Sequence, residues 1–514
     1  GSFDVNLNNN VAVNINAVSP GDATFISSAT QLNLQVPAAN MSQTASNNEI
    51  AAASNTATLT VNLTGAANLL TTCTYDIVYE YDSNSNVYGK SPTTKNGNKE
   101  ITLQVSNVNG TNNFVNEKNF DYDSSWTNNK RTLVSGATIS SNGSLTTQNI
   151  SITGKYYNLT ISQTSIEGKA FAGKIYVTNY SCSTSEIPPA YITLLNAYGG
   201  KGSITELPNS AFASVTTASE KGIYKADDDY TATTGMKSYY FRGAVDNNWV
   251  KFGKDSTGKD IYWRIIRING DGSIRMIYTG TTAPTESTKV VMTGTGTQIS
   301  TSAFNSSYNK AEYVGYMYSE GDQHGNSTDS TIKTTIDNWY KTTTLETDSA
   351  TKALVSQDQI FCNDRSASST QTAAWTSTGA NYYYGAYGRL DSNKTPILTC
   401  TTASDKFTVN ISNGNGALTY PVGLITADEV AMAGGKSGTS NSTYYLYTNQ
   451  YYWSGSPTYF NSSVGDANGF YVGSSDDLHG YGVIGALGAR PVVSLSSKAK
   501  LSGSGTYNDV YTVS

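Results

Sequence analysis

The chain has 514 residues, of which only 14% are charged, and its formal net charge is −6 at pH 7. This length suits two or more domains. No run of Lys or Arg could neutralise successive phosphates, and no apolar stretch approaches the roughly 18 residues that span a bilayer. Nucleic acid and a transmembrane helix are therefore not expected, and the polar, Tyr-rich composition is typical of secreted or surface-displayed β-rich proteins.

Apolar residues alternate with polar ones in several stretches of residues 1–182. The alternating residues include Leu32, Leu34 and Val36, then Leu59, Val61 and Leu63, and then Ile101, Leu103 and Val105. This spacing of two, with Asn, Gly and Ser between the runs, predicts an all-β antiparallel sandwich. Residues 183–191 are polar and contain two prolines, so we expect a linker there.

Residues 192–514 begin with a mixture of strand and helix patterns. Two β-rich runs flank the residues 269–272 (NGDG) and predict a hairpin. Further on, Ile332, Ile336, Trp339 and Tyr340 recur at helical spacing behind Ser and Thr capping candidates, which predicts a helix.

Two more helices are predicted before the chain returns to strands. Residues 345–355 (LETDSATKALV) predict one short helix. In residues 425–435, Thr426 and Glu429 have the spacing of a capping box, and Gly434 predicts the helix end. Strand patterns resume at Tyr444, so the second domain is predicted to be α+β.

The four cysteines are Cys73, Cys182, Cys362 and Cys400, and none has metal-like spacing. Of the three possible pairings, only Cys73 with Cys182 and Cys362 with Cys400 respects the division into two domains. We predict these two disulfides, with buried free thiols as the alternative. Disulfides would indicate an oxidising compartment, so an extracellular, cell-surface location is expected.

Catalytic and metal-binding patterns are sparse. The only histidines are His324 and His479, and the turn-like sequence around His324 predicts a solvated loop residue. The acidic run at 227–229 lacks the ligand spacing of an EF-hand and predicts a solvated turn. A pair of glycosidase carboxylates has no local signature, so an enzyme acting on glycans stays open. We expect no catalytic residue, no metal and no cofactor.

The segment from Ser454 to Ala489 contains no Lys, Glu, Gln, Met, Trp or Arg. Exposed segments ordinarily contain Lys and Glu. Mutation directed at the adenines of asparagine codons would generate this residue alphabet. A surface meander rich in Asn, Gly and Ser is the alternative explanation.

The phrases that frame this segment are YYWSGSP and GARPVVSL, with GFYV between them. They resemble the C-terminal variable region of proteins diversified by diversity-generating retroelements. Upstream, YYFRGAV, YWRIIRINGDGSIRMIY and LITADEVAMAGG resemble phrases of large surface proteins from low-GC gut bacteria. The resemblance implies a C-type-lectin-like fold, close to that of formylglycine-generating enzymes, over residues 192–514, with a variable region at 452–495.

Residue by residue, the resemblance divides this region into a frame and a variable, solvent-facing set. The frame would consist of Tyr452, Trp453, Ser456, Pro457, Phe460, Phe470, Val472, Arg490, Pro491, Val492, Val493 and Leu495. The ligand-binding set would consist of Tyr459, Asn461, Ser463, Val464, Asp466, Asn468, Asp477, His479, Tyr481, Val483, Ile484, Ala486 and Leu487. Such residues supply contact area and adaptable hydrogen bonds, as in antibody paratopes.

Two departures from related families bear on activity. The Glu-Pro-Asn and Gln-Pro-Asp triplets of calcium-dependent sugar lectins are absent from the terminal domain. Formylglycine-generating enzymes need a reactive cysteine pair, whereas we expect Cys362 and Cys400 to form a bridge. Neither metal-mediated sugar binding nor catalysis is therefore expected.

In the first domain, CTYDIVYEY and the later GKYYNLTISQTSIEGKAFAGKIYVTNYSC resemble camelysin-type biofilm matrix fibre proteins, which implies a stalk or filament-forming module over residues 1–182. Together these patterns predict a surface-displayed adhesin or receptor, not an enzyme. Its partner would be a protein or glycan on another cell, host or phage, and any membrane attachment would use a segment outside this sequence. The alternatives are a structural pilin or matrix subunit and, third, a glycan-acting enzyme.

Overall fold

A computed structural model shows a β-rich chain, with 39% of residues in strands and 17% in helices. It describes residues 4–5, 11–19, 22–26, 50–64, 69–81, 101–108, 110–112, 118–119, 127–141, 145–158, 170–171, 173–376, 378–474 and 477–514. The chain divides into two compact units, residues 1–187 and 188–514. Among the described residues, no helix is both long enough and apolar enough to cross a membrane.

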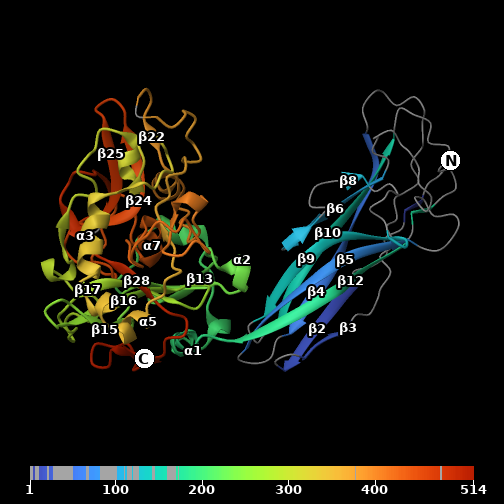
Figure 1. Ribbon diagram of the computed structural model, residues 1–514, viewed down its shortest axis with the longest axis horizontal. Helices are drawn as coiled ribbons and strands as arrows, with labels where there is room; N and C mark the ends of the chain where they lie inside the picture. The colour runs from blue at the N-terminus through green and yellow to red at the C-terminus, as the bar shows by residue number, and fades with distance from the viewer. Residues whose placement is uncertain are drawn as a thin grey trace. The chain divides into compact units, whose positions relative to one another are not determined.

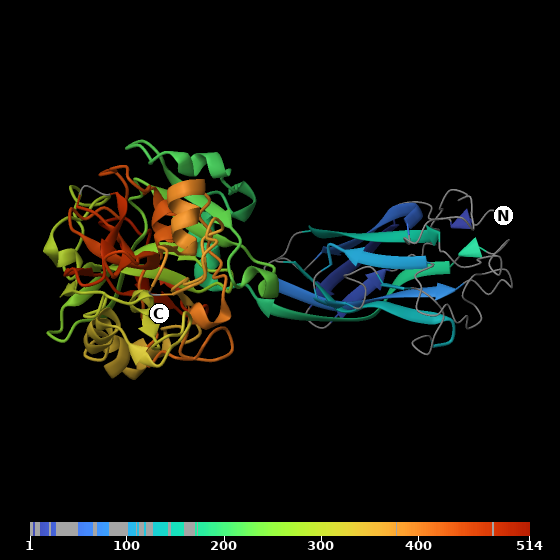
Figure 2. The same ribbon diagram turned by 90° about the horizontal axis from the view of Figure 1, so that it is seen from above.

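Unit 1 is a sandwich-like arrangement of two sheets, whose strands run along the long axis of the unit (Figures 1 and 2). The six-stranded sheet has the order β3 (Asp22–Ile26), β2 (Val11–Ser19), β4 (Ile50–Thr64), β10 (Leu145–Asn158), β6 (Ile101–Ser106) and β8 (Lys118–Asn119). The four-stranded sheet has the order β12 (Gly173–Glu186), β5 (Leu69–Tyr81), β9 (Lys130–Ser141) and β7 (Gly110–Asn112). The short strands β1 (Asp4–Val5) and β11 (Ala170–Phe171) pair in parallel.

The alternation predicted for unit 1 places apolar side chains in its core. Leu59, Val61 and Leu63 of β4 are fully buried, as are Cys73 and Tyr75 of β5. The strand predicted around residues 32–36 lies outside the described residues. The predicted disulfide Cys73–Cys182 is present and joins directly opposed residues of β5 and β12.

Residues 183–191 form regular structure where a linker was predicted. Ser183–Glu186 complete β12 and pair with β5, while Pro189 opens the helix α1 (Pro189–Asn196). Proline fits the first helical turn because its missing N–H would have no partner there. The polar and proline-rich composition thus reflects an edge strand followed by a helix start.

Unit 2 contains two larger sheets. The central sheet has the order β13 (Lys221–Ala226), β14 (Ser238–Gly243), β16 (Asp260–Ile268), β15 (Trp249–Lys254), β30 (Tyr511–Val513) and β29 (Leu501–Ser502), and β17 (Ile274–Gly280) joins β16 to β28 (Val492–Leu495). The terminal sheet has the order β18 (Ser300–Ser302), β27 (Leu487–Ala489), β24 (Tyr452–Asn461), β25 (Asp466–Val472) and β26 (Leu478–Gly482), with β22 (Tyr382–Tyr383) beside β24. Two small pairs are β19 (Met317–Tyr318) with β20 (Thr328–Asp329) and β21 (Phe361–Cys362) with β23 (Lys406–Phe407). The hairpin predicted around residues 269–272 is confirmed as β16–β17.

The helices of unit 2 are short. The remaining α-helices are α2 (Thr231–Thr234), α3 (Thr331–Tyr340), α4 (Thr344–Thr347), α5 (Ser349–Ala353), α6 (Gly385–Tyr387) and α7 (Ala427–Ala433). Single turns of 3-10 or π type occur at η2 (Lys201–Ser203), η3 (Asn209–Ala213), η4 (Thr295–Thr297), η5 (Ala311–Val314), η6 (Gly388–Asn393) and η7 (Ala403–Asp405). The helix α3 packs beside β18 and β27, and α7 packs beside β24 and β26 of the terminal sheet. Figure 1 shows α7 close to β24.

The caps explain where these helices begin. Ser330 caps α3, and Thr426 and Glu429 form the predicted capping box of α7, which ends at Gly434. The single helix predicted at 345–355 is divided into α4 and α5 at Asp348. Asp348 adopts an extended conformation and accepts a hydrogen bond from the amide of Thr351, so it ends one helix and caps the next.

Candidate ligand-binding surface

The residues predicted as a frame for the terminal segment are all buried. They are Tyr452, Trp453, Ser456, Pro457, Phe460, Phe470, Val472, Arg490, Pro491, Val492, Val493 and Leu495. Trp453 is fully buried, its indole N–H donates to the carbonyl of Ser302 at 2.9 Å, and its ring packs edge-on against Phe304. This contact fixes β24 against the chain around β18.

Arg490 holds the end of the segment through carbonyl groups. Its guanidinium donates two hydrogen bonds to the carbonyl of Tyr278 and one to that of Leu446, and it lies 4.7 Å from the ring centroid of Tyr452. Complete burial lowers the pKa of Arg490, because it removes the charged guanidinium from water. The arginine thereby ties β17 to the start of β24.

Most of the predicted ligand-binding residues reach solvent. Those classed as exposed are Ser463, Val464, His479, Tyr481, Ile484 and Ala486. Those partly buried are Tyr459, Asn461, Asp466, Asp477 and Leu487.

Two members of that set, Asn468 and Val483, are buried, so the expectation of exposure was wrong for them. Asn468 lies on the face of β25 opposite to that of Tyr471, and its side-chain amide donates to the backbone carbonyl of Asp466 at 2.9 Å. The backbone of Val483 lies between two other segments, because its carbonyl accepts from the amide of Asn305 and its own amide donates to the carbonyl of Ala467.

Residues of the predicted set occupy both faces of the strands β24, β25 and β26. Tyr471 pairs with His479 and Gly469 pairs with Tyr481, so these side chains share one face. Tyr459 lies opposite Asn468, an odd number of residues from Tyr471, and therefore belongs to the other face. The predicted set does not form a single flat surface.

The first face carries an aromatic patch, defined as Tyr451, Tyr471, His479 and Tyr481. The ring of Tyr471 lies 5.8 Å from Tyr451, 5.7 Å from Tyr481 and 6.3 Å from His479 between centroids. Tyr451 and Tyr481 are 50% and 49% exposed. At Gly485, beside Tyr481, an added Cβ would lie 2.2 Å from the tyrosine ring, so glycine allows the ring to lie against the β26–β27 turn.

The opposite face carries a smaller group of rings. Tyr383 of β22 lies 4.7 Å from Tyr387 and 5.8 Å from Tyr459 between centroids. These rings pack on one another.

Tyr451 and Tyr471 belong to the patch but were not predicted. The sequence pattern could have predicted both, because Tyr471 alternates with the buried Phe470 and Val472, and Tyr451 precedes the buried Tyr452.

Large exposed apolar residues are concentrated in this region. In unit 2 they are Tyr308, Ile411, Tyr451, Val464, Tyr481 and Ile484, and all except Ile411 lie in or beside the terminal sheet.

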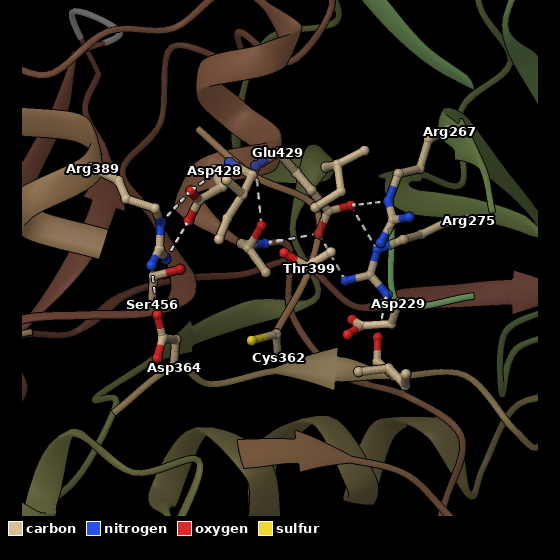
Figure 3. Close-up of a pocket in the computed structure, with 14 residues that line it drawn as sticks. Asp229, Arg267, Arg275, Cys362, Asp364, Arg389, Thr399, Asp428, Glu429 and Ser456 are labelled. Carbon is tan, nitrogen blue, oxygen red and sulfur yellow. Dashed lines mark hydrogen bonds and ion pairs between the residues drawn. The ribbon is translucent and has the colours of Figure 1, made fainter. Parts of the chain in front are cut away.

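An enclosed cavity lies between α7, the central sheet and the Cys362–Cys400 disulfide, whose pairing is as predicted (Figure 3). Arg275 and Arg267 bind Glu429 on one side, and Arg389 binds Asp364 and Asp428 on the other. Burial alone would raise the pKa of Glu429, but the two arginines outweigh it and leave the pKa below its usual value. The cavity measures about 20 Å³, which is room for about one water molecule.

The acidic run at 227–229 contributes to this region, so its prediction as a solvated turn was wrong for two of its three residues. Asp228 is buried and paired with Arg267 at 3.1 Å, and Asp229 accepts from the amide of Cys400 and pairs with Lys406. Only Asp227 remains exposed. The carboxylates stabilise the buried arginine and the backbone around the disulfide.

His324 is also more enclosed than predicted. Its Nδ1 lies 3.0 Å from both carboxylate oxygens of the fully buried Asp405, which also binds Arg365. This arrangement fastens the loop between β19 and β20. Within the described ranges, no group of three or more His, Cys, Asp or Glu residues is placed to hold a metal ion.

Comparisons with protein-family models, with curated proteins and with solved structures found no match for this chain.

Proposed function

We propose that this chain is an extracellular, surface-displayed ligand-binding protein, an adhesin or receptor whose terminal C-type-lectin-like domain is diversified by a retroelement. The observation that carries the proposal is the aromatic patch. Contiguous exposed aromatic residues on a soluble protein mark an interaction surface, because their exposure to water is otherwise unfavourable. Tyrosine also supplies large contact area with little loss of side-chain entropy.

The frame beneath the patch supports the same proposal. The fully buried Trp453 and Arg490 hold their strands through hydrogen bonds to the backbone carbonyls of Ser302 and Tyr278. Such contacts do not depend on the identity of the exposed side chains. Exposed positions can therefore change at a cost of only about 0.5 kcal/mol each.

The cavity between α7 and the central sheet is too small for a glycan substrate. A space of about 20 Å³ cannot hold a sugar ring. Its carboxylates at Asp364, Asp428 and Glu429 are engaged by arginines. The two disulfides are typical of an oxidising compartment, which fits display outside the cell.

The test compares the wild-type chain with the triple variant Tyr451→Ser, Tyr471→Ser, Tyr481→Ser on glycan arrays and on intact cells. The matched control is Tyr180→Ser, because Tyr180 is a 41% exposed tyrosine in unit 1. We expect a ligand that binds the wild type and the control but not the triple variant, with all three proteins equally folded. A ligand that binds all three proteins equally would show that the aromatic patch is not its binding site.

Retroelement diversification has a separate genomic test. A near-copy of the codons for residues 452–495 should lie beside a reverse transcriptase gene, with mismatches at adenines. Mismatches spread evenly over all four bases would contradict this part of the proposal.

A further inference from the structure

Lys333 is a lysine whose amine is hidden from water. It lies in the first turn of α3 and is buried there like Ile332 and Ile336, with only 1% of its side chain exposed. Lysine is almost never fully buried unless it is paired. The state of this amine is therefore set by the groups that surround it inside the fold.

Two carboxyl groups contact the amine. The Nζ of Lys333 lies 2.7 Å from Oδ2 of Asp337, one turn further along α3, and 3.2 Å from Oδ2 of Asp329, just before the helix. Lys333 and Asp337 share one face of the helix, because they are four residues apart. The side chain of Asp337 is 14% exposed, whereas that of Asp329 is 42% exposed. The amine thus contacts one carboxyl that is mostly buried and one that is open to solvent.

The surroundings of Asp337 favour its neutral form. Burial raises the pKa of Asp337 above its usual value, even though Lys333 stands beside it. The buried phenol of Tyr316 lies close to both aspartates, since their charges add to burial in raising its pKa, and its ring packs edge-on against Phe407. Such a setting disfavours separated charges, so it favours a neutral acid beside a neutral amine.

We infer that Lys333 and Asp337 become joined by an amide bond that forms within the folded chain. The bond between Nζ of Lys333 and Cγ of Asp337 forms, and one Cγ–O bond of Asp337 breaks. The leaving oxygen takes two protons from the ammonium and departs as water, so the step needs no further reactant. Asp329 accepts a proton from Nζ and returns it to the departing oxygen.

Close positioning and exclusion of water favour this reaction. Groups held at attack distance react with effective molarities of about 10⁵–10⁸ M, which offsets the cost of joining an amine to an acid. The burial of Nζ also keeps water from the product. The surface pair of Lys352 and Glu346 lacks this protection, because 43% of that lysine side chain is exposed.

The amide would strengthen the frame of the terminal sheet. The helix α3 packs beside β18 and β27. The backbone amide of Ile332 donates to the carbonyl of Phe304, whose ring contacts Trp453. A covalent link across the first turns of α3 would hold this support in place whatever ligand the aromatic patch binds.

The experiment is intact-mass spectrometry of the full wild-type chain after reduction and denaturation. We expect a mass below that of the sequence by one water molecule. Trypsin should not cut after Lys333, because its amine would be amidated, and the peptide 311–341 should carry the whole loss. Lys352 is the internal control, and trypsin should cut after it normally.

Two variants assign the reacting groups. Lys333→Arg keeps the positive charge but has no amine to attack Cγ, so it should recover the full mass. Asp329→Asn should slow linkage at least about tenfold in pulse-labelled chain, because positioned acid–base groups contribute about 10²–10⁴-fold to rates.

Full mass and normal cleavage after Lys333 in the wild type would overturn the inference, and this outcome requires no variant to fold. A mass loss that persists in Lys333→Arg would place the lost water elsewhere and would overturn it as well. Linkage of Asp329→Asn at the wild-type rate would overturn the proton transfer assigned to Asp329.

Discussion

The rings of Trp453 and Tyr481 lie 6.5 Å apart between centroids, yet Trp453 is fully buried and Tyr481 is half exposed. The boundary between frame and binding surface therefore runs between two adjacent aromatic side chains. The free energy lost on replacing an aromatic residue depends strongly on how deeply its side chain is buried. Replacement by alanine should therefore destabilise the fold far more at Trp453 than at Tyr481.

Trp453→Ala should lower the free energy of unfolding by about 3–5 kcal/mol, since it removes a fully buried aromatic and leaves a cavity. Tyr481→Ala should cost less than about 1 kcal/mol, because half of its surface already faces water. Thermal and urea unfolding of the two variants measures the difference. Equal losses would contradict the division into frame and surface.

Arg490→Met should destabilise the chain by about 2–4 kcal/mol. The substitution keeps similar volume but removes both guanidinium donors from the buried carbonyl of Tyr278, while the hydroxyl of Tyr452 still donates to the carbonyl of Leu446. Urea unfolding measures the loss, with Lys498→Met as an exposed control. A change as small as that of the control would mean that Arg490 is not a structural tie.

Glu429→Gln should change how stability depends on pH. Burial opposes ionisation of Glu429, but Arg275 and Arg267 leave its folded pKa below its usual value. A depressed folded pKa stabilises the fold above the unfolded pKa of about 4.3, and this contribution is lost as pH falls through the folded value. The wild type should therefore lose stability below about pH 4.5 more steeply than the variant.

The same substitution should lower stability at pH 7 by about 3–5 kcal/mol, because it leaves Arg275 buried without a carboxylate partner and leaves Arg267 with Asp228 alone. Urea unfolding between pH 3 and 7 measures both effects. Parallel pH profiles for the two proteins would show that Glu429 is not a source of the acid sensitivity.

Removing each disulfide should destabilise in proportion to the logarithm of the loop it closes. Cys362 and Cys400 are separated by 38 residues and Cys73 and Cys182 by 109. Chain entropy predicts losses of about 4 and about 5 kcal/mol for the paired Ser variants. The urea midpoints of the two double variants give the comparison, and an unchanged midpoint for either would contradict a closed bridge there.

Local patterns predicted much of the fold. The alternation of Leu59, Val61 and Leu63, the β16–β17 hairpin and the capping box of Thr426 and Glu429 are all determined by neighbouring residues, and each is present. The disulfide pairing followed from the division into two domains.

Long-range contacts could not be predicted in the same way. Asp228 is held in the interior by Arg267 and by the amide of Gly270, which lie 39 and 42 residues away, and His324 is held by Asp405, 81 residues away. The carbonyl of Val483 accepts from the amide of Asn305, which belongs to a distant segment. Such pairings depend on how distant segments meet, and no period in the sequence records them.

The most direct test of the account is a mutational scan of the displayed chain, sorted for folding with a conformation-specific antibody. We expect positions 479, 481, 484 and 486 to accept nearly all residues, and positions 453, 470 and 490 to accept almost none besides their own. Equal tolerance at the two groups of positions would contradict a fixed frame that presents interchangeable side chains.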